Sequence, residues 1–474
     1  MTDTIHFGTD GWRAIIGKDF TESNLARVVE AAAAVFKEES LAAGYSPNAL
    51  PVLLVGHDCR QDAHRFAQLA AGIAAAAGFT VMLSHDYCPT PALCWSIAHN
   101  EGAIGGIMLT SSHNPAEYLG VKLRMADGGA SPKDFTDRVE ALLPESPLFD
   151  RSPFTEVDFI EPYLEALRAL VDAEAINKAK LKVVVDPLYG AGRIHLANLL
   201  RDLGVEVVEI NNADDPSFDG LHPEPIPPWI DRGITKVQEL GFDAVFITDG
   251  DADRIGAIDA RGLFVNPHRI LTLLVAHLAE DKGLQGRVVS TITSSALLAR
   301  QCKRLGLDLT STPVGFKWIY GEMEKGDVMI GGEESGGIGI PTHVKERDGL
   351  LMALLLTEMM AERKMGLHDL VEQMFSQIGR LEFLRQGLTL AEEQMEVFRT
   401  ETVTHFTRES LCGKRVVEID RRDGIKFSLE DDAWVMMRPS GTEPLVRIYA
   451  EAATNEEVEA LLEAATIIVK GPLA

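Results

Sequence analysis

The sequence predicts three related α/β domains with largely parallel or mixed sheets, followed by a smaller α+β domain. One plan recurs at 51–83, 181–210 and 286–309: an apolar strand, a polar or Gly-containing loop, an Ala/Leu-rich helix and a second apolar strand. Each copy is close to the ~30 residues of a βαβ unit. After residue 381 the pattern changes to short strand-like runs separated by turns, which is typical of an α+β domain. The length of 474 residues also exceeds what one core usually supports, since domains commonly have ~100–200 residues.

The elements follow from the spacing of apolar residues. Helices are predicted at 63–77, 194–203 and 295–305, where apolar residues recur at helical spacing. In the last domain the predicted elements are strands at 414–420, 425–429, 433–437 and 445–451 and a closing helix at 455–468. A Pro-rich stretch at 144–153, a turn at 259–262 and the change of pattern after Gly379 mark the boundaries. The predicted domains are therefore 1–150, 151–261, 262–381 and 382–474.

Composition narrows the class of protein. The chain has 45 basic and 71 acidic residues and a formal charge of −26, which argues against nucleic acid or an anionic membrane surface as a partner. A phosphorylated substrate would therefore need a local basic pocket. The five cysteines are scattered, with no Cys-x-x-Cys pair, and no signal-peptide pattern or membrane-length apolar stretch is visible. We expect a cytoplasmic protein with reduced thiols.

Ser112 lies in a polar loop, Thr-Ser-Ser-His-Asn-Pro at 110–115, directly after the apolar run 103–109. No Gly-x-Ser-x-Gly elbow surrounds it, so the usual acyl-transfer interpretation of an active serine does not apply. The same residue types also suit an ordinary turn. Ser112 is nevertheless our candidate nucleophile.

Asp249, Asp251 and Asp253 alternate in the loop that follows the apolar strand 243–248. Carboxylates at this density suit a hard divalent cation such as Mg²⁺, because they repel one another unless a cation joins them. A calcium loop is excluded, since Arg254 and Ala260 stand where Gly and Glu are needed. A solvated turn is the remaining alternative.

Two later loops carry groups suited to a sugar phosphate. The Gly-flanked loop 331–337 offers Glu333 and Ser335, which could grip adjacent sugar hydroxyls, and Lys317 just upstream could pair with a phosphate. The loop 438–444 combines an arginine, two hydroxyls and a glycine, the ingredients of an anion nest. Each loop taken alone could be structural.

A dinucleotide site is a weaker alternative. Gly190-Ala191-Gly192 follows a strand and precedes a helix, but His195 occupies the third glycine position of the fingerprint. No Walker-type phosphate loop is present.

In chain order, the segments 7–13, 110–115, 249–254, 332–337 and 438–444 resemble motifs of the α-D-phosphohexomutase superfamily. The resemblance spans nearly the whole chain and implies a four-domain, heart-shaped protein around a central cleft. It also implies interconversion of hexose 1- and 6-phosphates through a phosphoserine and a hexose 1,6-bisphosphate, with Mg²⁺ and glucose 1,6-bisphosphate as cofactors.

The resemblance assigns roles residue by residue. Ser112 matches the phosphorylated serine, and Asp249, Asp251 and Asp253 match the Mg²⁺ ligands, with the serine phosphate completing the shell. The residues that match groups around the transferred phosphoryl are Arg13, His113, Lys122 and Arg254. The residues that match substrate-binding groups are Gly315, Lys317, Glu333, Ser335, Arg438, Ser440, Gly441, Thr442 and Arg447.

Glucose is the expected sugar. Glu333-Glu334-Ser335 and the segment 314–317 look more like phosphoglucomutases, whereas Gly337 replaces a histidine found in many phosphomannomutases and phosphoglucosamine mutases. Mannose or glucosamine specificity stays open. Outside the mutases, the rival classes are a metal-dependent sugar phosphatase and a non-catalytic sugar-phosphate binder.

Overall fold

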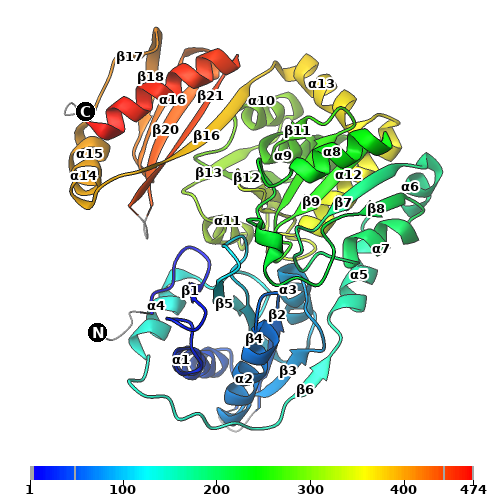
Figure 1. Ribbon diagram of the computed structural model, residues 1–474, viewed down its shortest axis with the longest axis vertical. Helices are drawn as coiled ribbons and strands as arrows, with labels where there is room; N and C mark the ends of the chain where they lie inside the picture. The colour runs from blue at the N-terminus through cyan, green and yellow to red at the C-terminus, as the bar shows by residue number, and fades with distance from the viewer. Residues whose placement is uncertain (1–4, 47–49, 441–443, 472–474) are drawn as a thin grey trace. The chain divides into compact units, whose positions relative to one another are not determined.

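The computed structural model describes residues 5–46, 50–440 and 444–471 (Figure 1). The chain divides into two compact units. Unit 1 comprises Met1–Val289 and Gly315–Val371, and unit 2 comprises Ser290–Val314 and Glu372–Ala474.

Unit 1 begins with a six-stranded sheet of order β1-β5-β4-β2-β3-β6, in which β1, β5 and β4 pair antiparallel and the remaining pairs are parallel. Its strands are β1 (Trp12–Ile15), β2 (Val52–His57), β3 (Thr80–Ser84), β4 (Ala103–Leu109), β5 (Tyr118–Met125) and β6 (Thr155–Val157). Its helices are α1 (Glu22–Ala42), α2 (Ala63–Ala76), α3 (Thr90–Ala98) and α4 (Lys133–Ala141). The central strands β2 and β4 are buried on both faces, which explains their nearly continuous apolar sequence.

Two adjacent glycines in β4 let helices approach the sheet from both sides. A Cβ on Gly105 would lie 2.4 Å from the ring of Phe36 in α1, and a Cβ on Gly106 would lie 2.5 Å from Ile97 in α3. Side chains alternate between the faces of a strand, so α1 and α3 cover opposite faces. This close packing fixes the end of β4, from which the Ser112 loop leaves.

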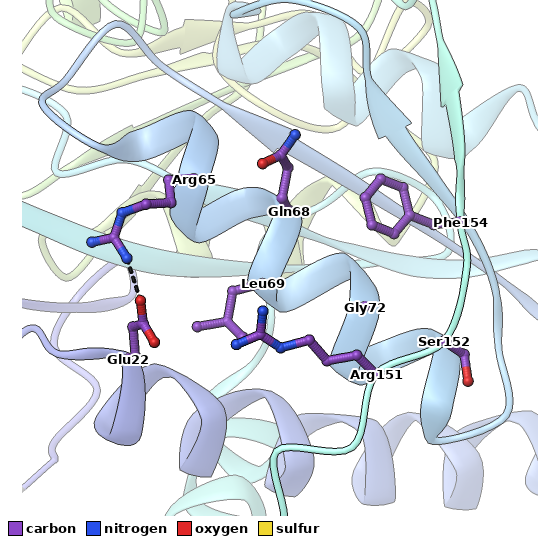
Figure 2. Close-up of a pocket in the computed structure, with 8 residues that line it drawn as sticks. All are labelled: Glu22, Arg65, Gln68, Leu69, Gly72, Arg151, Ser152 and Phe154. Atoms are coloured by element: carbon purple, nitrogen blue, oxygen red, sulfur yellow. Dashed lines mark hydrogen bonds and ion pairs between the residues drawn. The ribbon is translucent and has the colours of Figure 1, made fainter.

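The segment that follows α4 is fastened to α2. The Ser152 amide donates to the Gly72 carbonyl at 3.0 Å, and the aliphatic stem of Arg151 lies over Gly72. Figure 2 shows this crossing. The residues drawn there line a surface hollow of about 390 Å³. Strand β6, which comes after the predicted boundary at residue 150, pairs with β3 of the first sheet. The boundary itself stays a prediction.

The second sheet has the order β11-β10-β9-β7-β8, with β8, β7 and β9 parallel and β9, β10 and β11 antiparallel. Its strands are β7 (Lys182–Asp186), β8 (Glu206–Glu209), β9 (Ala244–Thr248), β10 (Ile255–Asp259) and β11 (Phe264–Val265). The helices of this region are α5 (Ile160–Arg168), α6 (Ala173–Ala179), α7 (His195–Asp202), η1 (Phe218–Gly220) and α8 (Asp231–Leu240). The metal-ligand candidates leave the carboxyl end of β9, the end at which parallel sheets usually bind ligands.

The third sheet has the order β13-β12-β14-β15, and the division between the two units falls within β12. Its strands are β12 (Arg287–Thr291), β13 (Leu309–Thr312), β14 (Val328–Gly332) and β15 (Ile338–Gly339). The helices of this region are α9 (Pro267–Ala276), η2 (His277–Asp281), α10 (Ala296–Leu305), α11 (Phe316–Met323), α12 (Gly349–Arg363) and α13 (Leu367–Ile378). Helix α12 is apolar on nearly all sides because it is buried on all sides. Asp348 caps its N-terminus by accepting a hydrogen bond from the Leu351 amide.

Unit 2 contains an antiparallel sheet of order β16-β21-β20-β19-β18-β17. Its strands are β16 (Glu382–Thr389), β17 (Ser410–Leu411), β18 (Lys414–Asp420), β19 (Ile425–Leu429), β20 (Trp434–Pro439) and β21 (Leu445–Ala452). Its short helices are α14 (Glu392–Val397), η3 (Phe398–Thr402), α15 (Val403–His405) and η4 (Glu430–Asp432), and α16 (Asn455–Lys470) closes the chain. Helix α16 packs into the larger core, and a second cluster joins Ile292 to Trp434, Met436 and Tyr449.

The predicted fold class is confirmed: three α/β sheets precede an antiparallel sheet with helices. Among the described residues, no helix combines the length and apolar character needed to cross a membrane.

Candidate active site

Ser112 adopts the left-handed backbone conformation, with φ of 51°, in the loop after β4. Its Oγ donates to Asp249 Oδ2 at 2.9 Å and lies 3.3 Å from His113 Nδ1. The two loops meet because Gly250 has no side chain: a Cβ there would lie 2.3 Å from the Ser112 carbonyl oxygen. The loops after β4 and β9 thus bring the candidate nucleophile to the candidate metal ligands.

The three aspartates form one buried cluster. Asp249, Asp251 and Asp253 each offer a carboxylate oxygen, and these oxygens lie within 4.8 Å of one another. Burial, followed by the charges of Asp251 and Asp253, raises the pKa of Asp249 well above its usual value. Asp251 Oδ1 and Asp253 Oδ1 have no hydrogen-bond partner among the described residues. Orphaned, converging carboxylate oxygens fit a hard divalent cation such as Mg²⁺.

Lys122, on β5, neutralises part of this cluster. Its Nζ lies 2.7 Å from Asp251, 2.9 Å from Asp253 and 2.9 Å from Asp10, and its side chain is only 1% exposed. Burial alone would lower the pKa of Lys122, but the three carboxylates outweigh it, so the pKa is raised. Lys122 is therefore a fixed cation.

Arg347 is a second buried cation in the same cluster. It forms ion pairs with Asp253 at 2.8 Å and with Asp10, and its guanidinium lies 5.4 Å from the centre of the Phe316 ring. Thr90 also donates its hydroxyl to Asp251. These contacts join residues of distant segments of unit 1, from Asp10 to Arg347, in one cluster of acids and cations.

Arg13 and Arg254 border the cluster. Arg13 donates to the side chain of Asn114 in the Ser112 loop. The Arg254 backbone amide donates to Asp249 Oδ1 at 3.1 Å, and its Nε stands 3.9 Å from Asp249 without a hydrogen-bond partner among the described residues. A buried guanidinium with an unused donor is suited to an oxyanion.

The candidate sugar loop links β14 to β15. Glu333 Oε1 accepts from the Gly315 amide at 2.9 Å, and burial, followed by the charge of Glu334, raises the pKa of Glu333 to about 7. Ser335 is half-buried in the same loop, whereas Lys317 lies 5.6 Å from the ring of its neighbour Trp318.

Gly337 makes room for Arg347. A Cβ on residue 337 would lie 2.3 Å from Arg347 Cδ. Residue 337 can therefore carry no side chain while Arg347 keeps its place.

The candidate phosphate loop belongs to unit 2 and is described by itself. Arg438 on β20 and Arg447 on β21 are direct cross-strand partners, and Arg438 Nε donates to Asp423 at 2.8 Å. The Ser440 amide donates to the Leu445 carbonyl at 2.7 Å. Like charges placed directly opposite each other destabilise a sheet unless an anion joins them. Gly441 and Thr442 lie outside the described residues.

The glycines at 190–192 have a structural explanation. A Cβ on Gly190 would lie 2.7 Å from the Gly250 carbonyl oxygen, and a Cβ on Gly192 would lie 2.6 Å from Thr248 Oγ1. The Ala191 amide also donates to the Gly250 carbonyl at 2.9 Å. This turn packs against the aspartate loop, which explains its glycines without a bound dinucleotide.

Sequence reasoning missed three members of the cluster: Asp10, Thr90 and Arg347. Asp10 lies in the segment 7–13 already singled out for Arg13. Arg347 is the third residue of a charged run, Lys-Glu-Arg-Asp, directly before the apolar α12, and such a run at a buried helix start was a usable signal. Thr90 had no local signal.

Four family models match the chain in order. They are the phosphoglucomutase/phosphomannomutase alpha/beta/alpha domains I, II and III, at residues 4–147, 161–262 and 266–378, and the C-terminal domain of the same family at 396–467.

Similar proteins cover nearly the whole chain. A phosphoglucomutase/phosphomannomutase from Thermococcus kodakarensis is 32% identical over 463 residues, 96% of each chain. A protein named as a probable phosphoglucosamine mutase, from Methanosphaera stadtmanae, is 31% identical over 463 residues, also 96% of each chain. A solved structure described as a provisional phosphomannomutase, from Thermus thermophilus, matches with a TM-score of 0.88 and 37% identity and covers 99% of this chain and 100% of its own.

Proposed function

The chain belongs to the α-D-phosphohexomutase superfamily, and we propose that it interconverts glucose 1-phosphate and glucose 6-phosphate through a phosphoserine at Ser112. The family supports phosphohexomutase activity, which is a broader statement than the choice of glucose as the sugar. The observation that carries the choice of nucleophile is the hydrogen bond from Ser112 Oγ to Asp249, at the edge of a buried cluster of three aspartates.

The proposed reaction has two balanced transfers. In the first, the bond between phosphorus and Ser112 Oγ breaks as a sugar hydroxyl oxygen bonds to the phosphorus; the hydroxyl proton passes to a base, and the leaving Ser112 Oγ gains a proton. In the second, after the glucose 1,6-bisphosphate has turned over, Ser112 Oγ gives up its proton to the base and attacks the other phosphoryl group, and the leaving sugar oxygen gains a proton. His113 and Lys122 match the groups that could move this proton, and we favour His113, whose Nδ1 lies 3.3 Å from Ser112 Oγ, because three carboxylates hold Lys122 in its charged form.

The side chains around Ser112 have separate tasks. Lys122 and Arg254 offset the charge of the transferring phosphoryl group, the main requirement of this chemistry. Arg13 holds Asn114 of the serine loop. Asp249, Asp251 and Asp253, with the serine phosphate, would hold Mg²⁺, which supplies further neutralisation of charge when bound.

Two loops, one in each unit, carry the proposed substrate-binding groups. Glu333 and Ser335 would accept and donate hydrogen bonds to paired sugar hydroxyls, with Gly315 fixing Glu333 and Lys317 nearby. The pair Arg438 and Arg447, with Ser440, Gly441 and Thr442, would hold the phosphate that does not react. Contacts to paired hydroxyls tolerate the two opposed orientations that the bisphosphate must adopt.

Glucose is the proposed sugar because of the Glu-Glu-Ser pattern and because Arg347 occupies the space beside Gly337. The names of the relatives favour mannose and glucosamine phosphates as the second candidates. Steady-state kinetics on the 1-phosphates of glucose, mannose and glucosamine decide between them, with the highest kcat/KM expected for glucose.

The test of the mechanism is intact mass before and after incubation with glucose 1,6-bisphosphate. We expect one phosphoryl group on wild-type protein and none on Ser112→Ala, which should lose nearly all turnover while keeping its fold. A binder would acquire no phosphate, and a phosphatase would release free phosphate in step with substrate loss. Unchanged turnover in Ser112→Ala would remove Ser112 from the mechanism.

We place the enzyme in the cytoplasm, since its five cysteines are free thiols.

A further inference from the structure

A buried ring of hydrogen bonds starts and ends at the backbone of Ser112. The Ser112 amide donates to Thr110 Oγ1 at 2.9 Å, and the Thr110 hydroxyl donates to Asp58 Oδ2 at 2.6 Å. Arg60 Nε donates to the same Asp58 oxygen at 3.2 Å, and Arg60 Nη2 donates to the Ser112 carbonyl at 2.6 Å. The ring therefore holds both backbone polar groups of one residue.

Arg60 also binds backbone carbonyls outside the ring. Its guanidinium also donates to the carbonyl oxygens of Asn114 at 2.6 Å, Pro115 at 2.7 Å and Tyr118 at 3.0 Å. The side chains of Arg60 and Asp58 are both fully buried, at 0% exposure. One guanidinium thus binds four carbonyls of the loop 112–118 through its two terminal nitrogens, while its Nε binds Asp58.

Ser112 needs such support. A residue with a Cβ rarely adopts the left-handed conformation, and it persists only where the surroundings impose it. The glycine that faces Ser112, Gly250, belongs to the aspartate loop rather than to the serine loop. The ring supplies the constraint from the sheet side, through the loop that follows β2.

From this geometry we infer that Asp58 and Arg60 are positioning residues for phosphoryl transfer, holding Ser112 Oγ against the aspartate loop without touching the substrate. The inference rests on the proposed role of Ser112. A merely structural ring would lower stability on disruption but would leave the rate of transfer in the folded protein unchanged.

The experiment replaces two members of the ring, Arg60 and Thr110. Arg60→Lys keeps the charge but offers three donors to five acceptors, and Thr110→Val removes the link between the Ser112 amide and Asp58 with little change in volume. Thr110→Ser keeps the hydroxyl and is the matched control. Arg421→Lys is the second control, because Arg421 also binds two loop carbonyls, those of Val403 and Phe406, but within unit 2.

The readout is the single-turnover rate at which glucose 1,6-bisphosphate phosphorylates Ser112, measured by intact mass, together with KM and the thermal midpoint. We expect about a 100-fold slower transfer in Arg60→Lys, the scale set by a displacement of about 1 Å at a reacting group. Thr110→Val should be slowed by at least about tenfold, with KM changed by less than about threefold in both. The two control variants should stay within about twofold of wild type.

The outcomes separate this inference from the proposed function. A wild-type protein that acquires no phosphate on Ser112 overturns both. A wild-type protein that acquires it, while Thr110→Val reacts at the wild-type rate, overturns the positioning inference alone. If Arg60→Lys does not fold, the comparison of Thr110→Val with Thr110→Ser decides, because neither change removes a buried charge.

Discussion

Replacing Lys122 with methionine should destabilise unit 1 and make its stability depend more strongly on Mg²⁺. The methionine side chain fills a similar volume but removes a charge that lies within 2.9 Å of three carboxylates. Asp10 and Asp253 keep their ion pairs with Arg347. Asp251 keeps the hydrogen bond from the Thr90 hydroxyl, but its buried charge would lose its paired cation.

The expected loss of stability follows from these contacts. Removing one partner of a buried ion pair costs about 3–5 kcal/mol, and the remaining arginine places this case at the lower end, about 3 kcal/mol. At about 2.1 cal/mol/K per residue, the roughly 350 residues of unit 1 give about 1.4 °C per kcal/mol, so its unfolding midpoint should fall by about 4 °C in the presence of EDTA. Mg²⁺ at 100 times its Kd stabilises the wild type by about 2.7 kcal/mol. It should stabilise the variant more, because the aspartates have lost a competing cation.

Scanning calorimetry of wild type, Lys122→Met and Lys133→Met, each in EDTA and in Mg²⁺, measures these midpoints. Lys133 is the control, since its ion pair with Asp137 is 67% and 52% exposed and should contribute less than about 1 kcal/mol. The reasoning fails if Lys122→Met unfolds within about 1.4 °C of wild type in EDTA, the shift that corresponds to roughly 1 kcal/mol. It also fails if Mg²⁺ raises both midpoints equally.

Gly72→Ala should stabilise the protein by about 0.5–1 kcal/mol, because alanine favours a helix interior and its Cβ would meet the crossing arginine of Figure 2 at an ordinary 3.4 Å; a lower thermal midpoint would contradict this. Gly337→Ala should lower kcat by about tenfold or more by displacing Arg347, whereas Gly321→Ala, with nothing within 4 Å of its Cβ, should match wild type in the same turnover assay. Burial lowers the pKa of His195 from 6.5 to about 4, so the unfolded chain takes up the proton first and stability is lost as pH falls through this window. Denaturant unfolding should show about 2 kcal/mol of that loss between pH 7 and pH 5, and His195→Gln should abolish it; an unchanged slope would refute the assignment.

The sequence predicted the fold well where local pattern decides structure. The strands at 414–420 and 425–429 have the observed limits, and the helix predicted at 63–77 is Ala63–Ala76. Alternation and helical spacing carry this information because each element must bury one face. Strand β6 was missed because three exposed or half-buried residues, Thr-Glu-Val, carry no such pattern.

Local sequence patterns could predict the candidate site only where its residues are contiguous, whereas Arg13 and Lys122 were assigned through the family resemblance. Asp249, Asp251 and Asp253 stand out because three acids share one loop, and Ser112 because its loop is polar after an apolar strand. Arg347 and Thr90 reach the same cluster from distant segments, and no local rule says which arginine or threonine will face it. Arg60 is the extreme case, since its partners are mostly backbone carbonyls, which every sequence has.

The chain leaves unit 1 for unit 2 after Val289, returns after Val314 and leaves again after Val371. Unit 2 is therefore made in two pieces during translation, with part of unit 1 made between them. The piece 290–314 leaves the ribosome before the rest of unit 2 exists. Ile292 and Val314 must wait for Trp434 and Met436 to be made before they can be covered. At ~5–20 residues per second, the interval from 314 to 434 lasts roughly 6–24 s. Slow translation between 315 and 371 would lengthen this exposure and give chaperones, or aggregation, more time to act.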